Sequence, residues 1–389
     1  MRNFKLKDIS SVIVGFALFL LTQPYFIWGL SVQVKLCIQI VPVIFFLLHN
    51  NFSSNRKNLV LFVSLLSLLF YSVLLQRLSF HYGLFMVSFA IIPFVKYGYA
   101  HKTYTSFRII YAIVLSVSLV VWLLVLLGVT FPYTIIEPLN PLKQYNYSAY
   151  PFMVMPNSIL GLGRFFGLFD EPGVIGTISL MVLYIEKYNF KKLLNIPIFI
   201  SGFFSMSLFF ILGTLIFLFV KYVIFKPKYA FFVAVFLGVL YLSTKNIEII
   251  KDMVYSRLEW DSSANTISGN NRATDDLIHY FNSIRGSKTY FFGADENTIE
   301  LFSGSAGYRN AILQYGFVFC FLYIVIFFMI SVSKGLDPKS RIAFLAFLVM
   351  VIYQRPGFCD AVYMFMFSQF IYSLQPKIQT LEKPYGYIR

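Results

Sequence analysis

The chain has 389 residues, of which 58% are hydrophobic and only 13% are charged. Soluble domains carry roughly 25% charged residues, so the composition excludes an ordinary soluble protein and indicates an integral membrane protein. The formal net charge of +15 does not predict nucleic-acid binding, because lysines and arginines gather at the cytoplasmic ends of membrane helices.

Apolar runs near ~20 residues, long enough to cross a bilayer, recur along the chain and predict helices rather than a barrel. We therefore expect an all-α polytopic membrane protein with a single transmembrane domain over residues 1–389. The run 192–223 is long for one span, and we expect it to break within "GFFSMS" (Gly202 to Ser207), where glycine and serine ease a break. The expected spans are 10–29, 31–48, 58–75, 80–96, 106–129, 172–187, 192–205, 207–223, 229–244, 310–332, 341–355 and 360–375.

The charges support this count of twelve spans. With the N-terminus inside, most lysines and arginines fall in inner segments and most acids in outer ones. Merging 192–223 into one span would move the basic cluster "KYVIFKPK" (Lys221 to Lys228) outside and invert every later segment, against the positive-inside rule. Both termini are thus predicted to be cytoplasmic, and the two sizeable loops, 130–171 and 245–309, to be extracytoplasmic.

The second loop contains a predicted amphipathic helix within residues 272–286. Thr274 can cap its N-terminus and Gly286 can end it. Leu277, Phe281 and Ile284 recur at helical spacing. We expect this apolar face to pack onto the membrane domain.

The stretch "GRFFGLFDEPGVIGT" (Gly163 to Thr177) places charges beside an apolar run. Pro172 suits the first position of a helix, so Glu171 would cap it and Asp170 would precede it. On one interpretation, the acids only start a helix near its positive end. On the other, they form the floor of a water-filled cavity, because a carboxylate near the hydrocarbon is expensive unless it is paired or hydrated. Arg164 could pair with Glu171 if the segment is partly helical.

Four outer arginines lie where topology does not require them, and some of them could be no more than solvated loop charges. Guanidinium groups bind phosphates in a bidentate manner, and a carboxylate can accept the proton of a hydroxyl. This set suits a reaction in which a sugar hydroxyl displaces a lipid-linked pyrophosphate and arginines stabilise the charge on the leaving group. The candidate pyrophosphate-binding residues are Arg164, Arg257, Arg272, Arg285 and Arg309, and the candidate catalytic residues are Glu171, Asp170, Arg164, Arg272 and Arg309.

Metal and cofactor motifs are missing from the sequence. It contains no D-x-D of the kind that holds a sugar-nucleotide-bound metal, no H-E-x-x-H and no cysteine or histidine pair with metal-ligand spacing. We predict no metal and no cofactor. His279 lies on the predicted loop helix, where it is either a surface histidine or a candidate base.

The first loop is rich in aromatic residues. Tyr145, Tyr147 and Tyr150 lie in "QYNYSAYPFMVMP", and flat rings suit the apolar faces of sugars. The alternative is a belt of aromatic side chains at the membrane interface. We take these tyrosines, with Asn310 and His279, as candidate sugar-binding residues.

Four features of the chain resemble the O-antigen polymerases, within the wider O-antigen polymerase and ligase superfamily. Each is a short motif, and the resemblance extends to length and span count. The features are "GRFFGLFDEPGVIGT"; the serine-containing break "GFFSMSLFFILG"; one long outer loop with basic residues and "YFFGAD" near its end; and the loop exit "GYRNAILQYGFVFCFLYI".

The resemblance implies a membrane-embedded glycosyltransferase of the GT-C type in the bacterial inner membrane, with its active site facing the periplasm. A growing glycan would pass from undecaprenyl pyrophosphate to the non-reducing end of a new lipid-linked repeat unit. The donor and the acceptor are then both lipid-linked oligosaccharides. The anomeric centre would invert without a metal, and a chain-length regulator is a conceivable partner.

Within the motifs, Arg164 and Glu171 match the first, and Asn310 matches the last together with Leu313 and Gly316. Arg309 stands where the ligase branch often has a histidine that is read as the base. We predict Glu171 as the base, followed by Asp170 and then His279. The alternative functions are an O-antigen ligase acting on lipid A-core and a flippase or exporter of lipid-linked oligosaccharides.

Overall fold

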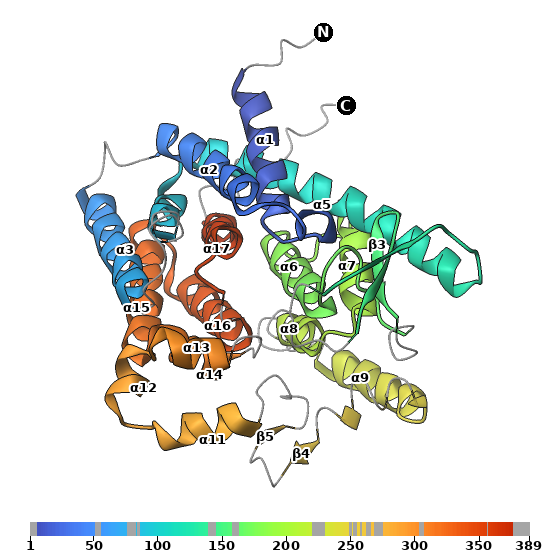
Figure 1. Ribbon diagram of the computed structural model, residues 1–389. Coiled ribbons are helices and arrows are strands. Elements are labelled where there is room, and N and C mark those ends of the chain that lie inside the picture. The colour runs from blue at the N-terminus through green and yellow to red at the C-terminus, as the bar shows by residue number, and fades with distance from the viewer. Residues whose placement is uncertain are drawn as a thin grey trace. The chain divides into compact units, whose positions relative to one another are not determined.

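The computed structural model is mostly helical, with a few short strands (Figure 1). Its backbone groups into two compact units, one formed by Met1–Tyr111 with Ala273–Arg389 and the other by Ala112–Arg272. The structure describes residues 6–50, 56–75, 83, 86–138, 145–157, 163–219, 230–248, 251, 255–256, 259–261, 266–267, 275–302, 307–355 and 357–375.

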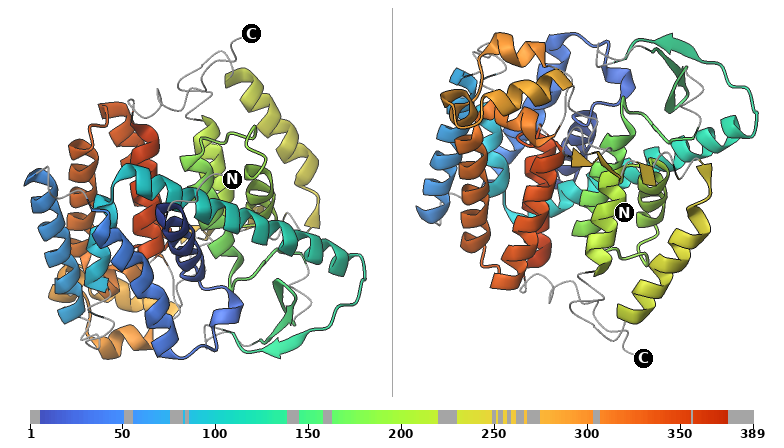
Figure 2. Two further views of the ribbon diagram at one scale, coloured as in Figure 1. Left: turned by 90° about the horizontal axis from the view of Figure 1, so that it is seen from above. Right: turned by 90° about the horizontal axis from the view of Figure 1, so that it is seen from below.

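The first unit is built from helices of both chain ends. Helices α3 and α15 lie side by side (Figure 2), and Ser333 Oγ donates a 2.9 Å hydrogen bond across them to Asn58 Oδ1. Tyr372 Oη donates to the carbonyl of Val95, which ties α17 to the 3₁₀ helix η3. The elements are α1 (Leu6–Leu20), η1 (Tyr25–Ile27), α2 (Val32–Leu48), α3 (Arg56–Leu75), η3 (Phe89–Phe94), the first half of α5 (Tyr97–Leu126), α11 (Asp275–Ser283), α12 (Lys288–Phe292), α13 (Glu296–Leu301), α14 (Tyr308–Tyr315), α15 (Phe317–Ser333), α16 (Pro338–Gln354) and α17 (Ala361–Leu374).

A sharp bend separates α14 from α15. The two axes differ by 101°, and Gly316 is the residue between them, with φ +85°. A side chain at this position would also meet the backbone of Phe291 and Phe292 at 2.6 Å. The expected continuous span 310–332 is therefore wrong. The physical reason is that glycine tolerates a backbone conformation that ends one helix and redirects the next.

The second unit is built around α6 (Pro172–Ile185), α7 (Asn195–Phe204) and α8 (Leu208–Phe219). These three helices pack on one another (Figure 2), and α6 approaches the break after α7 so closely that a side chain at Gly176 would lie 2.3 Å from Ser207 Cβ. The unit also holds the second half of α5, α9 (Ala230–Thr244) and five short strands.

Two small antiparallel sheets correct the all-α expectation. Strands β1 (Thr134–Ile136), β2 (Tyr147–Tyr150) and β3 (Met153–Pro156) form one sheet in the order β1-β2-β3, and β4 (Trp260–Asp261) pairs with β5 (Thr266–Ile267). The three-stranded sheet lies inside the predicted first outer loop. It pairs Ser148 with Met155, and the residues of β3 are buried. The apolar residues 153–156 therefore belong to a strand of that loop.

Most helix positions agree with the sequence-based expectations. Helix α6 begins at Pro172 after Glu171, and the run 192–223 breaks at Ser205 to Ser207, between α7 and α8. The predicted loop helix is α11, whose Leu277 and Phe281 are buried, as is Ile284 just after its end. Leu277 and Ile284 share a core with Leu313 of α14. Thr274, the cluster Lys221 to Lys228, and much of the second loop lie outside the described residues.

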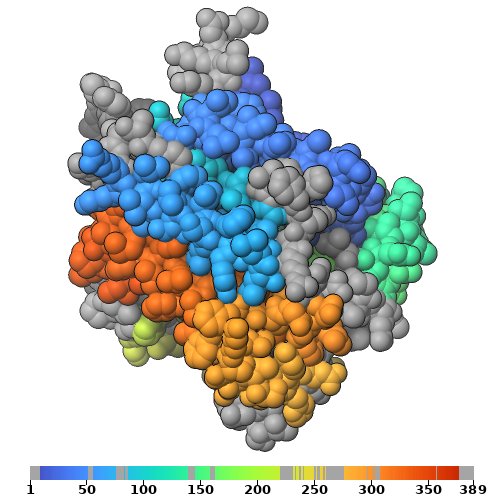
Figure 3. All heavy atoms as spheres, turned by 60° about the vertical axis from the view of Figure 1, so that its left-hand side comes forward, coloured from blue at the N-terminus to red at the C-terminus, as the bar shows by residue number. Residues whose placement is uncertain are grey.

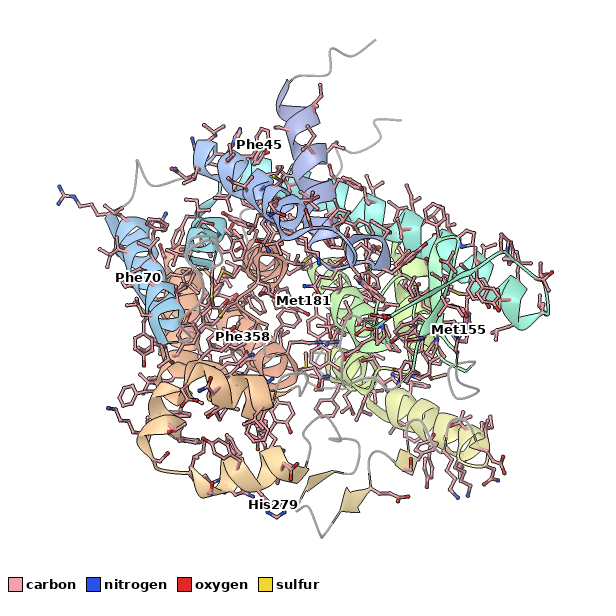
Figure 4. All side chains as sticks on the ribbon, viewed as in Figure 1. Phe45, Phe70, Met155, Met181, His279 and Phe358 are labelled. Atoms are coloured by element: carbon pink, nitrogen blue, oxygen red, sulfur yellow. The ribbon has the colours of Figure 1, made fainter. Side chains whose placement is uncertain are left out.

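Several helices are apolar, but few are long. Within the described ranges, α3 and α5 are long and apolar enough to cross a membrane, and the bent pair α14–α15 would make a third if it counts as one span. Shorter apolar helices of 10–17 residues include α2, α6, α7, α8 and α17. On the face of the first unit in Figure 3, α3 (blue) lies uncovered. Figure 4 shows Phe70 pointing outward from α3, where it is 52% exposed.

Candidate functional site

The acidic turn before α6 is held in place by the first-loop sheet. Tyr147 of β2 is fully buried, and its Oη donates a 2.6 Å hydrogen bond to the main-chain oxygen of Asp170. The Asp170 side chain is itself 8% exposed. Glu171 is half-buried and is the N-cap of α6, but its side chain accepts no capping hydrogen bond from that helix.

The guanidinium of Arg164 lies at the C-terminal end of α7. Its Nε and Nη2 each donate a 3.2 Å hydrogen bond to the main-chain oxygen of Ser205, a position where a cation offsets the partial negative charge of a helix end. The amide of Phe165 donates to the oxygen of Phe204, and the Phe165 ring packs on Trp122. Residues 163–170 form turns and irregular backbone rather than a helix, and Arg164 binds the serine-containing break between α7 and α8.

The buried position of Tyr147 changes its expected role. Burial raises the pKa of its hydroxyl far above the usual value, so the group stays a phenol and a hydrogen-bond donor. With 0% exposure, its ring has no face on which a sugar could stack. We therefore assign Tyr147 the positioning of the acidic turn, whereas Tyr145 and Tyr150 are half-buried and remain candidates for sugar contact.

Replacing Tyr147 by phenylalanine tests this positioning role. Tyr147→Phe removes the bond to Asp170, and a buried hydrogen bond contributes about 1 kcal/mol, so the thermal midpoint in detergent should fall by about 2 °C. The matched control is Tyr133→Phe, because Tyr133 is 56% exposed and should tolerate the change. An equal midpoint for both variants would contradict the proposed role of Tyr147.

In the first unit, the residues just after α11 and the start of α14 place two predicted arginines near one aromatic ring of α11. The Cζ atoms of Arg285 and Arg309 lie 5.9 and 6.0 Å from the centroid of Phe281. Arg309 Cζ also lies 5.1 Å from the ring of Tyr308. Cation–π contacts of this kind orient a guanidinium without neutralising it.

The electrostatic situation of Arg309 is unusual. The residue is 8% exposed, and its Nε is buried without a hydrogen-bond partner. Among the described residues, no ion pair or hydrogen bond to its guanidinium is found. A buried cation without a counterion is costly, so this position is suited to an anion that arrives from outside the chain.

The remaining predicted residues are placed as follows. Asn310 is buried beside Arg309, whereas His279 lies on the exposed side of α11, pointing away from α14 (Figure 4). The structure therefore does not bring His279 to Arg309. Arg257 and Arg272 lie outside the described residues, and Arg164, Asp170 and Glu171 belong to the second unit. No group of three metal-ligating side chains is found in the part of the chain that the structure describes.

Two aromatic residues near Arg309 were not selected from the sequence. The rings of Tyr308 and Tyr353 stack with centroids 5.1 Å apart and planes inclined by 16°. Tyr353 lies in the last turn of α16, 45 residues further along the chain than Tyr308. Sequence spacing gives no signal for such a pair, although Arg355 in "YQRPGFCDAVY" follows Tyr353 by two residues.

Comparison with known proteins does not assign the chain to a family. No protein-family model matches the chain, and neither a curated protein nor a solved structure matches it.

Proposed function

We propose that this chain is a membrane-embedded glycosyltransferase that polymerises lipid-linked O-antigen repeat units. In this proposal the protein resides in the bacterial inner membrane with twelve membrane-entering helical segments, and its site faces the periplasm. The growing glycan passes from undecaprenyl pyrophosphate to the non-reducing end of a new lipid-linked unit. Support comes from the four motifs, from the apolar helices, and above all from Arg309.

Arg309 is the observation that carries the proposal. A guanidinium that is nine-tenths buried and has no acidic partner among the described residues provides the stabilisation that a departing diphosphate needs, since preorganised cations act most strongly away from water. Arg285, which also contacts the ring of Phe281, adds a second cation. The two guanidinium groups suit an anionic ligand better than a neutral glycan.

The proposed reaction has a simple balance of bonds. A hydroxyl of the acceptor sugar attacks the anomeric carbon of the donor glycan while the bond from that carbon to the diphosphate oxygen breaks. The base that accepts the hydroxyl proton is a carboxylate, for which the family resemblance suggests Glu171 first and Asp170 second. Undecaprenyl pyrophosphate leaves as an anion and needs no general acid. The attack inverts the anomeric centre.

The test is extension of lipid-linked repeat units by the purified protein. Incubation with repeat-unit lipid alone should give a ladder of products, whereas a ligase would leave single units and a flippase would move lipid without lengthening glycan. A deletion strain should make lipopolysaccharide with one repeat unit on its core. Glu171→Gln and Arg164→Ala should leave expression intact and stop extension. Long products in both variants would remove these residues from the catalytic set.

A further inference from the structure

Phe281 is the side chain through which helix α11 contacts the buried arginine of α14. Its ring is 2% exposed, and the ring centroid lies 6.0 Å from Arg309 Cζ. Tyr308, the residue before Arg309, presents a second ring at 5.1 Å. The rings of Phe281 and Tyr308 meet edge to face, with centroids 5.9 Å apart and planes inclined by 87°. The guanidinium of Arg309 therefore contacts two rings that stand nearly at right angles to each other.

The two rings restrain Arg309 in different ways. Among the described residues, no ion pair or hydrogen bond to its guanidinium is found, so the contacts that orient this long side chain are with aromatic rings. Tyr308 lies on the same helix as Arg309 and moves with it. Phe281 belongs to another helix, so its ring fixes the guanidinium relative to the rest of the first unit.

The packing of α11 and α12 on α14 holds the Phe281 ring in place. Leu277, one turn earlier on α11, is fully buried and shares a core with Leu313 of α14. The amide of Ala294 donates a 2.8 Å hydrogen bond to the main-chain oxygen of Leu313. Tyr290 of α12 packs on Phe281, with centroids 5.8 Å apart. The position of the Phe281 ring thus depends on how these helices pack.

We infer that Phe281 is a positioning residue that orients the Arg309 guanidinium toward the departing diphosphate, so that Arg309 is in place only while α11 is packed on α14. The inference rests on the proposed function and adds a role to a residue that the sequence predicted only to pack on the membrane domain. Cation–π attraction orients a guanidinium without neutralising it, so the full charge of Arg309 remains available to the diphosphate. Because the charge on the leaving oxygen develops in the transition state, loss of this orientation should lower kcat rather than raise KM.

Steady-state kinetics of glycan extension, with repeat-unit lipid purified from the cells in which the protein acts, test this role. Phe281→Leu keeps apolar bulk but removes the ring, so kcat should fall about tenfold with KM within twofold. Phe281→Met is a second ring-free variant and should behave alike, whereas Phe281→Tyr keeps the ring and should retain kcat within twofold. Phe281→Leu combined with Arg309→Ala should be no slower than Arg309→Ala alone, because Phe281 acts through Arg309.

The matched control is Leu277→Val on the same helix, since Leu277 is fully buried in the core that it shares with Leu313. Its thermal midpoint should fall as in Phe281→Leu, while its kcat stays within twofold of the unmodified protein. An equal loss of kcat in Leu277→Val and Phe281→Leu makes Phe281 a structural residue and overturns the inference. Unchanged kcat in both ring-free variants, or a further tenfold loss on top of Arg309→Ala, also overturns it. In each of these cases the unmodified protein still makes a ladder. Absence of that ladder refutes the proposed function, and the positioning role falls with it.

Discussion

Arg309→Ala is expected to lower the rate of glycan extension by about 100-fold or more while leaving the fold intact. Removing one preorganised group that stabilises the leaving charge costs on the order of 10²–10³ in rate. Stability should not fall in parallel, because a buried cation without a counterion carries a desolvation cost that alanine does not. The initial rate of ladder formation and the thermal midpoint of the same preparation measure the two effects.

Two further variants separate charge from geometry. Arg309→Lys keeps the charge but loses the planar fork that grips phosphate, so it should recover only part of the rate. Arg285→Ala removes an exposed cation near the same ring and should cost less than tenfold, since solvent screens it. Arg309 is a structural residue if Arg309→Ala keeps more than half of the unmodified protein's rate, or if its thermal midpoint falls sharply. The proposed leaving-group chemistry then loses its main support.

Gly316→Ala is expected to disrupt the fold of the first unit. Gly316 has φ +85° and ψ 153°, a region that side chains enter at a cost of about 1–3 kcal/mol. The new methyl group would also meet main-chain atoms of residues 291–293 at 2.6–2.7 Å, and backbone cannot rotate away as a side chain can. Because native proteins are stable by only about 5–15 kcal/mol, the variant should accumulate poorly in membranes and melt at a clearly lower temperature.

Two other glycines separate the conformational cost of a positive φ from the cost of the steric clash. Gly128 has φ +86° but open space around it, and Gly98 has open space without a positive φ. Gly128→Ala should therefore show the conformational cost alone, and Gly98→Ala, inside α5, should be neutral or slightly stabilising. Identical melting of Gly316→Ala and Gly98→Ala would show that the bend after α14 is not dependent on glycine.

Local sequence signals predicted the helices well and their long-range partners poorly. Pro172 marked the start of α6, and the Gly202–Ser207 stretch marked the end of α7, because proline and glycine act on the backbone of their own neighbourhood. The burial of Leu277 and Phe281 followed from helical periodicity. These predictions needed no knowledge of what packs against the segment.

The errors arose where distant residues decide the structure. Gly316 was matched to the loop-exit motif but expected to lie within a continuous span, and its close approach to the backbone at residues 291–293 cannot be predicted from local sequence. Tyr147 was predicted to contact a sugar, yet it is fully buried and its hydroxyl donates a hydrogen bond to the main-chain oxygen of Asp170, 23 residues along the chain. The pairing of Tyr308 with Tyr353 depends on how α14 meets α16, which composition and spacing do not encode.

The lengths of α7 and α8 bear on where a catalytic hollow could lie. With 10 and 12 residues at ~1.5 Å per residue, each covers only about half of the ~30 Å hydrocarbon layer. In the proposed membrane setting, the two helices form a re-entrant hairpin that starts and ends at the cytoplasmic surface. Every later segment then stays on its predicted side of the membrane. Its tip, Ser205, then lies at mid-depth, a location tolerated because that backbone is enclosed by protein. Arg164, which donates to the main-chain oxygen of Ser205, then lies at the same depth as that tip.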